Sequence, residues 1–270
     1  MKIGIYARRA AAEKIERLDR LCSALEINGN SLYRVRSAED LQDGTDMLLA
    51  IGGDGTFLSS AALVRDSGVP VLGVNMGRLG FLSENAPEII ADTLASGAFE
   101  IEKRTLLEVR TDTGLDIWPY ALNEVTVHRN SHAMLGVDVS LDGRPLPTYW
   151  ADGLLIATAS GSTAYSLSVG GPIVLPDSRV HIVSPIAPHN LNVRPMIVPD
   201  SAEISLSFRS RCSSVTLTVD NRSVQLPAGA SVTVRMAQFS LNRVRLGDAN
   251  FIDALRTKLF WGEDIRNNNE

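Results

Sequence analysis

Hydrophobic positions in the first hundred residues follow two periods. Four short, nearly continuous apolar runs predict β-strands at residues 2–7, 32–35, 47–51 and 70–74. Between and after them, apolar residues recur every three or four positions, which predicts helices at residues 15–25, 57–64 and 87–97. Strands that alternate with helices indicate a parallel sheet covered on both faces, with ligands bound at the carboxyl ends of the strands.

From about Glu100 the hydrophobic pattern changes to a period of two. Alternating segments predict strands at residues 107–111, 122–127, 137–141, 204–208, 215–219 and 232–236. Asp142-Gly143, directly after one of these segments, predicts a hairpin turn. We therefore expect a mainly antiparallel β domain with one solvated face, which accounts for its many Ser, Thr and Arg residues.

Helical spacing returns near the end of the chain, from Phe251 to Phe260. A single helix after a β domain has little of its own to pack on, so we expect it to fold back onto the first domain. The expected fold class is α/β + β. An N-terminal α/β (Rossmann-like) nucleotide-binding domain at residues 1–100 is completed by the helix at about 249–262, and a β-sandwich domain occupies 101–248. Residues 267–270 are expected to be a frayed tail.

Length and composition are those of an ordinary globular protein with two domains: 270 residues, 44% hydrophobic and 21% charged. The net charge of −5 argues against a general nucleic-acid binder, which carries a basic face. Neither a signal-peptide pattern nor a run near the roughly 20 apolar residues of a membrane span is present. The two cysteines and four histidines lack metal-ligand spacing. We therefore expect a cytoplasmic protein with no protein metal site and no membrane partner.

The first candidate for chemistry is Gly52-Gly53-Asp54-Gly55-Thr56, where an apolar strand gives way to a helix. Glycines there let the backbone approach a phosphate closely, and the N–H groups that open the helix favour anions. Asp54 does not fit a simple phosphate site, because a carboxylate repels phosphate unless a metal ion lies between them or the acid accepts a hydroxyl proton. The alternative is a plain glycine-rich turn in which Asp54 supplies a local cap.

The loop at residues 75–82 follows the next strand and contains two glycines, Arg78 and Phe81. These residues suit the edge of a ligand site, with the Phe81 ring covering an apolar or aromatic group. An ordinary loop with Phe81 packed into the core remains the alternative.

A second constellation spans residues 149–172, where an apolar strand ends in small hydroxyl residues around Gly161 and a short helix carries Tyr165. Hydroxyls, helix-start N–H groups and an aromatic face can together hold a ribose, a phosphate and a base. Upstream, Asn123-Glu124 can accept from ribose hydroxyls and read an adenine edge, or can be solvated residues of an edge strand. Asp220-Asn221 is interpreted from its local sequence as a hairpin turn.

In their order and spacing, the glycine turn, the 75–81 loop, Asn123-Glu124 and the 152–172 segment resemble the bacterial NAD kinases, over about residues 1 to 262. The glycine turn alone is shared with lipid kinases such as the diacylglycerol kinases, and in part with phosphofructokinases. The second segment is far more specific.

This resemblance implies transfer of the γ-phosphate of ATP to the 2′-hydroxyl of the adenosine ribose of NAD, giving NADP, with Mg²⁺ or another divalent cation. It also implies a homotetramer or homodimer, and it makes Asp54 the catalytic carboxylate. The residues assigned to NAD are Asp54, Gly55, Phe81, Asn123, Glu124, Trp150, Asp152, Thr163, Ala164, Tyr165, Ser166, Leu167, Ser168, Ala187 and Asp220.

The chain departs from the family pattern at two places. Trp150 stands where many relatives have a basic residue, so the resemblance does not decide the preference between NAD and NADH or the contacts across subunits. Ala159-Ser160 stands where the commoner pattern reads Pro-Thr, a milder change that should leave the turn intact.

No Gly-x-x-x-x-Gly-Lys-[Ser/Thr] motif is present, so ATP is not held as in P-loop proteins. We expect the phosphates to be bound by N–H groups of Gly52, Gly53, Gly55 and Thr56, with Arg8, Arg9 or Arg78 as candidate partners. Two rival functions are a lipid kinase, which needs an apolar or membrane-binding surface, and a dinucleotide sensor without turnover, for which Asp54 has no use.

Overall fold

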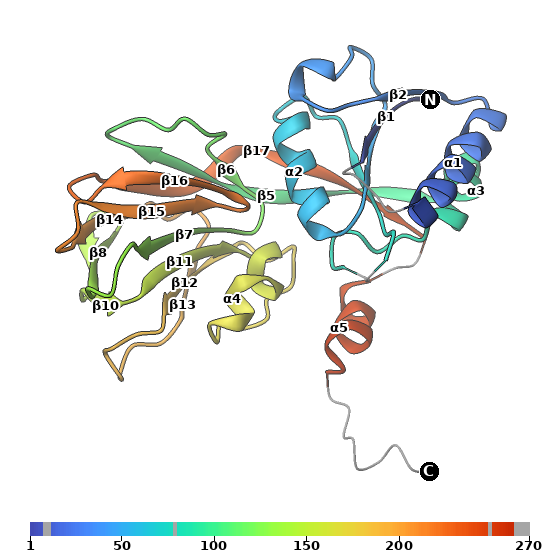
Figure 1. The fold of residues 1–270 in the computed structure, drawn as a ribbon. Helices are drawn as coiled ribbons and strands as arrows, with labels where there is room; N and C mark the ends of the chain where they lie inside the picture. The colour runs from blue at the N-terminus through green and yellow to red at the C-terminus, as the bar shows by residue number, and fades with distance from the viewer. Residues whose placement is uncertain (8–11, 78–79, 248–249, 262–270) are drawn as a thin grey trace, which may run out of the picture. The chain divides into compact units, whose positions relative to one another are not determined.

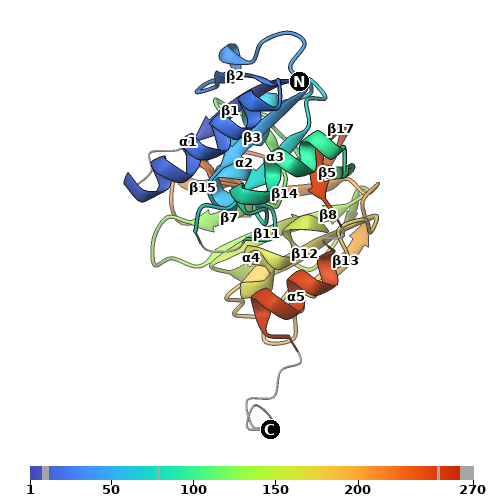
Figure 2. The ribbon, with the colours of Figure 1, turned by 90° about the vertical axis from the view of Figure 1, so that its right-hand side faces the viewer.

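The computed structural model describes residues 1–7, 12–77, 80–247 and 250–261. The chain divides into two compact units, which are described separately (Figures 1 and 2). The α/β unit contains Met1–Lys103 and the chain from Leu241 onward, and the β unit contains Arg104–Ser240. Two long strands, β5 (Phe99–Thr111) and β17 (Val232–Leu246), contribute residues to both units.

The elements of the α/β unit follow the expected alternation. In chain order they are β1 (Lys2–Ala7), α1 (Ala12–Ile27), β2 (Ser31–Arg34), the 3₁₀ turn η1 (Ala38–Asp40), β3 (Met47–Ile51), α2 (Asp54–Val64), β4 (Val71–Val74), α3 (Pro87–Ser96) and α5 (Phe251–Leu259). The predicted strands and helices of this half of the chain are confirmed. α3 begins at Pro87 and is followed by Gly97 in the left-handed conformation, and both residue types are typical of these helix ends.

A parallel sheet in the order β4-β3-β1-β2 forms the centre of the α/β unit. β3 is buried at every position, which explains its continuous apolar run, because helices cover both faces of the sheet. In Figure 1, α1 and α3 lie together on one side of these strands and α2 lies on the other. The Arg17 guanidinium links α1 to Glu88 of α3 through hydrogen bonds of 2.9 and 3.0 Å. Because β3 and β4 are parallel neighbours in this sheet, their carboxyl ends lie side by side.

The last helix, α5, belongs to the α/β unit, as expected from its position after the β strands. Asn250 caps it by accepting the Asp253 N–H at 2.9 Å. The Phe251 ring lies 6.1 Å from the ring of Phe81, which places α5 against the segment that follows β4.

The β unit contains short strands and two single helical turns. Its elements are β6 (Tyr120–Ala121), β7 (Glu124–Arg129), β8 (Leu135–Leu141), β9 (Arg144–Pro145), β10 (Tyr149–Ala151), β11 (Gly153–Thr158), the 3₁₀ turn η2 (Ser160–Thr163), α4 (Tyr165–Ser168), β12 (Val180–Ile186), β13 (Met196–Pro199), β14 (Ile204–Arg209), β15 (Ser214–Val219) and β16 (Arg222–Pro227). The predicted hairpin at Asp142-Gly143 is confirmed, because both residues have positive φ and Leu141 pairs with Arg144.

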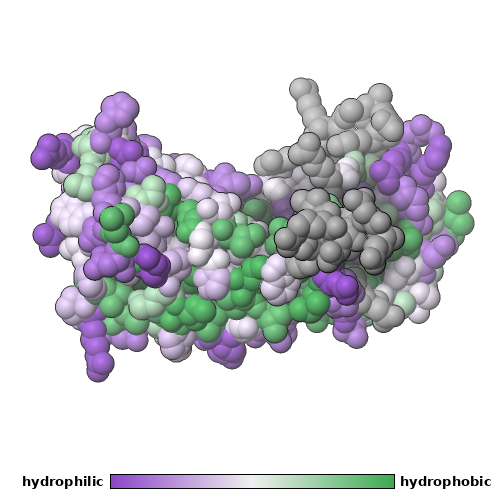
Figure 3. All heavy atoms as spheres, turned by 90° about the horizontal axis from the view of Figure 1, so that it is seen from below, coloured by the Kyte–Doolittle hydropathy of each residue, from purple (hydrophilic) through white to green (hydrophobic). Residues whose placement is uncertain are grey.

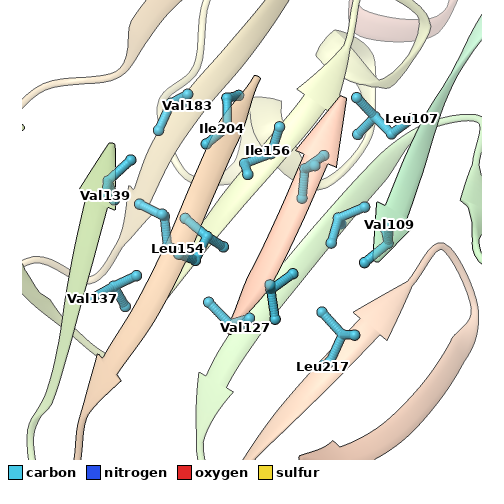
Figure 4. Packing of buried hydrophobic residues seen from close by; sticks show 14 of the residues in the cluster. Leu107, Val109, Val127, Val137, Val139, Leu154, Ile156, Val183, Ile204 and Leu217 are labelled. Carbon is cyan, nitrogen blue, oxygen red and sulfur yellow. The ribbon is translucent and has the colours of Figure 1, made fainter. Parts of the chain in front are cut away.

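Two antiparallel sheets form a sandwich in the β unit. One has the order β13-β12-β11-β7-β15-β16, and the other includes β10-β8-β14-β17. Val127, Leu154 and Leu217 from the first sheet pack against Val137 and Ile204 from the second (Figure 4). Each fully buried aliphatic side chain of this kind contributes about 1.5–3 kcal/mol to folding. The expected α/β plus β-sandwich fold class, with a final helix, is confirmed.

Some large apolar side chains remain exposed, among them Leu175, Leu191 and Ile197 of the β unit. Figure 3 shows green, hydrophobic spheres among purple ones on the face it presents. Within the described residues, the helices are too short or too polar to span a bilayer.

Candidate active site

The glycine turn lies at the carboxyl end of β3. The Gly52 N–H donates to the carbonyl of Val74 at 2.8 Å, which ties the turn to the end of β4. Gly53 is the N-terminal cap of α2, and Asp54 is the first helical residue. A side chain at position 52 would overlap Thr56, so the chain can turn this tightly only with glycine there. The turn therefore places Asp54 and the positive end of the α2 dipole together at the edge of the sheet.

Three consecutive backbone N–H groups hold the Asp54 carboxylate. The Phe81 N–H donates to Oδ2 at 2.8 Å, and the N–H groups of Leu82 and Ser83 both donate to Oδ1 at 2.9 Å. Gly80 makes this approach possible, because a Cβ there would overlap the Asp54 carboxylate. Since a carboxylate offers about four lone-pair sites, one site on Oδ2 is not used by the described residues and can accept a further partner. The acid is thus fixed in orientation and still has room to accept one proton or hydrogen bond.

The Phe81 side chain is half-buried, and its ring faces residues of α5. Lys258 Nζ lies 4.7 Å from the centroid of the Phe81 ring and 3.6 Å from Glu84 Oε2. Burial lowers the pKa of Lys258, whereas the carboxylates of Glu84 and Asp54 act to raise it. Arg8, Arg9 and Arg78, the arginines considered as phosphate partners, lie outside the described residues.

In the β unit, Asp220 is held in a closely similar way. It lies in the turn between β15 and β16 with φ of 51°, and its side chain points inward. Oδ2 accepts the Leu122 N–H at 2.8 Å, and Oδ1 accepts those of Asn123 at 2.9 Å and Glu124 at 3.2 Å. Burial raises the pKa of Asp220, and these N–H donors, with Arg222 at 4.0 Å, oppose that shift. Asp220 is therefore a turn residue, as its local sequence indicates, and also a buried anchor of the 122–124 backbone.

Asn123 and Glu124 are not solvated residues of an edge strand, because β7 lies between β11 and β15. Burial, and then the nearby charge of Asp220, raises the pKa of Glu124 to about 8. Asn123 Oδ1 and Glu124 Oε2 are buried and have no hydrogen-bond partner among the described residues. A buried polar atom without a partner costs about 1–3 kcal/mol. A ligand that donates to these two oxygens would recover that cost.

The turn after β11 is pinned to the same backbone. Thr158 donates its hydroxyl to the Leu122 carbonyl at 2.6 Å and accepts the Gly161 N–H at 3.0 Å. Gly161 lies so close to the Asn123 carbonyl that a Cβ would overlap it. The turn leads through Thr163 and Ala164 into α4, where Ser166 Oγ is buried without a hydrogen-bond partner among the described residues. Gly161 is therefore needed for close packing at this position.

Asp152, just before β11, and Tyr165, the first residue of α4, each have charged or aromatic neighbours. Arg129 Nε is 2.8 Å from Asp152 Oδ1, and His189 Nε2 is 3.8 Å from the same oxygen. The His128 ring stacks on Tyr165 with centroids 6.1 Å apart and planes 12° from parallel. Burial raises the pKa of Tyr165, and the carboxylates of Glu124 and Asp152 add to that shift. Tyr165 remains 37% exposed, so its ring can still contact a ligand.

The remaining residues assigned to NAD lie at the margins of this group. Ala187, with φ of 47°, follows Ile186, whose carbonyl accepts the Asp152 N–H at 3.0 Å. Leu167 and Ser168 complete α4. Trp150 packs over Gly136 of β8, where a Cβ would lie 2.8 Å from Trp150 Cζ3. The structure thus brings Asn123, Glu124, Asp220 and the 158–168 turn together, and it holds Trp150 against β8.

Two groups of residues result, one in each unit. The α/β unit presents a fixed carboxylate at a helix N-terminus beside a half-buried aromatic ring. The β unit presents an amide, a buried acid, hydroxyls and an aromatic face, which suit a nucleoside. Among the described residues, His, Cys, Asp and Glu side chains form no group of three that could hold a metal ion.

Comparison with known families decides between the possible uses of such a site. A model of the ATP-NAD kinase N-terminal domain matches residues 3–97, and a model of the ATP-NAD kinase C-terminal domain matches residues 122–246. The chain belongs to the NAD kinase family. The NAD kinase of Bacteroides fragilis is 39% identical over 289 residues, covering 98% of this chain and all of the relative. That of Porphyromonas gingivalis is 40% identical over 288 residues, covering 98% and 99%.

Solved structures extend this similarity within the NAD kinase family. Yeast NADH kinase in complex with NADH superposes with a TM-score of 0.88 at 25% identity, covering 98% of this chain and 89% of that chain. An NAD kinase from Archaeoglobus fulgidus in complex with ATP superposes with a TM-score of 0.79 at 25% identity, covering 96% and 99%.

Sequence reasoning missed several residues that the structure brings to the two groups, and the signals for two of them were present. His128 is four positions after Glu124 on a strand, so a period of two places both side chains on one face. Lys258 is seven positions after Phe251 on a helix, so it falls on the apolar face. Arg129, His189 and Glu84 have no local signal, because their contacts depend on the packing of distant segments.

Proposed function

We propose that this chain transfers the γ-phosphate of ATP to the 2′-hydroxyl of the adenosine ribose of NAD, giving NADP, with Asp54 as the catalytic carboxylate. The observation that carries the role of Asp54 is its position at the end of β3, where three N–H groups fix its carboxylate and leave one lone-pair site on Oδ2. Membership of the NAD kinase family supports the reaction itself.

Asp54 would act on the ribose hydroxyl. A hydroxyl is a weak nucleophile, and phosphoryl transfer requires it to be aligned with the γ-phosphate and to lose its proton. A carboxylate with a free lone pair in a fixed direction can accept that proton. General-base assistance of this kind is typically worth about 10²–10⁴ in rate.

The β unit would bind NAD. Asn123 Oδ1 and Glu124 Oε2 are buried acceptors without protein partners among the described residues, which supports donors on the ligand opposite them. Glu124, which is largely protonated at neutral pH, can also donate its own proton to a ribose oxygen. Tyr165 offers an aromatic face on which a base can stack.

ATP would be bound as its Mg²⁺ complex, with the divalent cation held mainly by the triphosphate oxygens. Gly53 and Gly55 would contact the phosphates through the backbone at the start of α2, where the helix dipole favours negative charge. The N–H groups of Gly52 and Thr56, which were also expected to bind phosphate, already donate to the carbonyls of Val74 and Gly53, each at 2.8 Å. When bound, the cation would neutralise charge at the phosphates.

Three further expectations belong to this proposal. The domain at residues 1–100 with 249–262 would be the nucleotide-binding domain that carries Asp54, and the domain at 101–248 would carry most of the NAD-binding residues. A homotetramer or homodimer would be the working assembly, and the cytoplasm, where NAD and ATP are both present, would be its location.

The decisive experiment is incubation of the purified protein with NAD, ATP and Mg²⁺, with NADP measured by an NADP-specific dehydrogenase assay. Asp54→Asn is expected to bind NAD within about twofold of the wild-type affinity and to lose about 10²–10⁴ of the turnover. Asp66→Asn, which removes an exposed carboxylate outside the site, is the matched control.

Each rival function predicts a different result in this experiment. Binding of NAD without any NADP would indicate a sensor, and phosphorylation of diacylglycerol instead of NAD would indicate a lipid kinase. Near wild-type turnover of Asp54→Asn would refute the role of Asp54 while leaving the reaction in place.

A further inference from the structure

α5 brings an ammonium group into the interior of the α/β unit. The Lys258 side chain is only 6% exposed, and its Nζ has no hydrogen-bond partner among the described residues. Its neighbours are the face of the Phe81 ring, 4.7 Å from Nζ to the centroid, and Glu84 Oε2 at 3.6 Å. An ammonium buried in this way is costly unless a specific arrangement of nearby groups offsets its desolvation.

Glu84 is the acid that this ammonium faces, and it is shared with a second buried cation. Arg243 of β17, whose side chain is 5% exposed, forms an ion pair with Glu84 and donates to Glu102 of β5 at 3.0 Å. Glu84 is thus held from one side by the sheet, through Arg243, and faces α5 through Lys258. Because Arg243 remains paired with Glu84 and Glu102, neutralising Lys258 alone would leave no carboxylate of this cluster without a cation.

The residues that Lys258 touches enclose the segment that holds Asp54. Phe81, Leu82 and Ser83 supply the three N–H groups to the Asp54 carboxylate. Phe81 is the first of these three donors, and Glu84 directly follows the last one. Phe251 lies on the same face of α5 as Lys258, and its ring is 6.1 Å from the Phe81 ring. The position of these N–H groups therefore depends on contacts made at both ends of the segment by α5.

We propose that Lys258 is a positioning residue for Asp54: its contacts with Phe81 and Glu84 fix the 81–84 segment, whose N–H groups in turn fix the direction of the Asp54 carboxylate. α5, which lies far from the glycine turn in the sequence, is on this account part of the catalytic machinery. The inference rests on the proposed function for its kinetic consequence, and on the geometry alone for its structural consequence.

The test compares Lys258→Met, which keeps the length and apolar stem of the side chain, with Lys258→Arg, which keeps the charge. Arg256→Met is the matched control, because it removes a positive charge from the exposed face of the same helix. Steady-state NADP formation gives kcat and the KM for NAD and ATP. Hydrogen–deuterium exchange of peptides covering residues 80–85 reports the 81–83 N–H groups without any dependence on turnover.

Lys258→Met is expected to lower kcat by about 10- to 100-fold, the range expected for misplacement of a catalytic group, with both KM values within about threefold of wild type. The 80–85 peptides should exchange faster, Lys258→Arg should recover part of kcat, and Arg256→Met should behave as wild type. If Lys258→Met does not fold, Phe251→Leu, which weakens the contact with Phe81, is expected to give the same kinetic and exchange pattern.

Unchanged exchange in the 80–85 peptides, or a kcat within about twofold of wild type, would overturn the inference. A raised KM for ATP with unchanged kcat would also overturn it, because it would make Lys258 a phosphate ligand. If the wild-type protein forms no NADP, the proposed function fails, and the exchange measurement still decides whether Lys258 holds the segment.

Discussion

Asp220 and Glu124 are joined twice through hydrogen bonds that involve their backbones. The Asp220 N–H donates to the Glu124 carbonyl at 2.9 Å, and the Glu124 N–H donates to Asp220 Oδ1 at 3.2 Å. This arrangement brings two acids together in the interior of the β unit, and the pKa of Glu124 rises to about 8 through burial and the charge of Asp220. Glu124 is thus available as a neutral group that both donates and accepts.

The raised pKa of Glu124 predicts a stability that falls as the pH rises. The pKa of Glu124 is near 4.5 in the unfolded state and about 8 in the folded state, so between these pH values the folded state binds more protons. The contribution of Glu124 to the free energy of unfolding is therefore fully present below pH 4.5 and is lost as the pH rises to about 8. Within that window it should reduce the free energy of unfolding by about 1.4 kcal/mol per pH unit. Urea denaturation between pH 5.5 and 7.5 should show this slope in the wild type and not in Glu124→Gln. Equal slopes in the two proteins would contradict the prediction.

Replacing Asp220 by Asn should weaken both folding and NAD binding. The side-chain NH₂ of Asn would face N–H groups of residues 122–124, which need acceptors, so at least one of these hydrogen bonds is lost. We expect a loss of about 1–3 kcal/mol in the free energy of unfolding and a rise of about tenfold in the Kd for NAD, measured by calorimetry. Asp142→Asn, in an exposed hairpin turn of the same unit, serves as the control.

Gly80→Ala should lower kcat, although it replaces none of the groups proposed to react. An alanine Cβ would overlap the Asp54 carboxylate, so either the acid or the 80–83 segment must move. Steady-state assays are expected to give a kcat lowered by about 10- to 100-fold. Gly229→Ala makes the same chemical change where a Cβ meets nothing within 4 Å, and it should retain wild-type kinetics. Similar rates for the two alanine variants would count against the geometry of the Asp54 site.

His181 predicts the opposite pH dependence in the acid range. Burial lowers its pKa to about 4, opposed by Asp200, and both ring nitrogens lack hydrogen-bond partners among the described residues. From pH 6.5 down to 4 the unfolded state binds the proton more readily, so the free energy of unfolding should fall by about 1.4 kcal/mol per pH unit from this group. Thermal denaturation should show this loss in the wild type and a flatter profile in His181→Leu. His132→Gln, at an exposed position, should follow the wild type.

Most elements of this fold are encoded locally, which is why the sequence alone predicted them, whereas the strands β12, β13 and β16 were not predicted. A buried strand such as β3 requires a continuous apolar run, an amphipathic helix such as α1 requires a period near 3.6, and Asp142-Gly143 supplies the positive φ angles of a hairpin. Asp54 was identified in the same way, because only glycine permits the tight turn around it and a carboxylate there needs a chemical reason.

Tertiary structure alone decided what holds these residues in place. The donors to Asp54 come from 27 to 29 residues away, and those to Asp220 come from 96 to 98 residues away. Every residue carries the same backbone N–H group, so the side-chain sequence does not mark which ones will act as donors. Hydrophobic periodicity repeats within one element and can be read along the chain, whereas a hydrogen bond between distant segments exists only after the core has packed and brought them within 3 Å or so of one another.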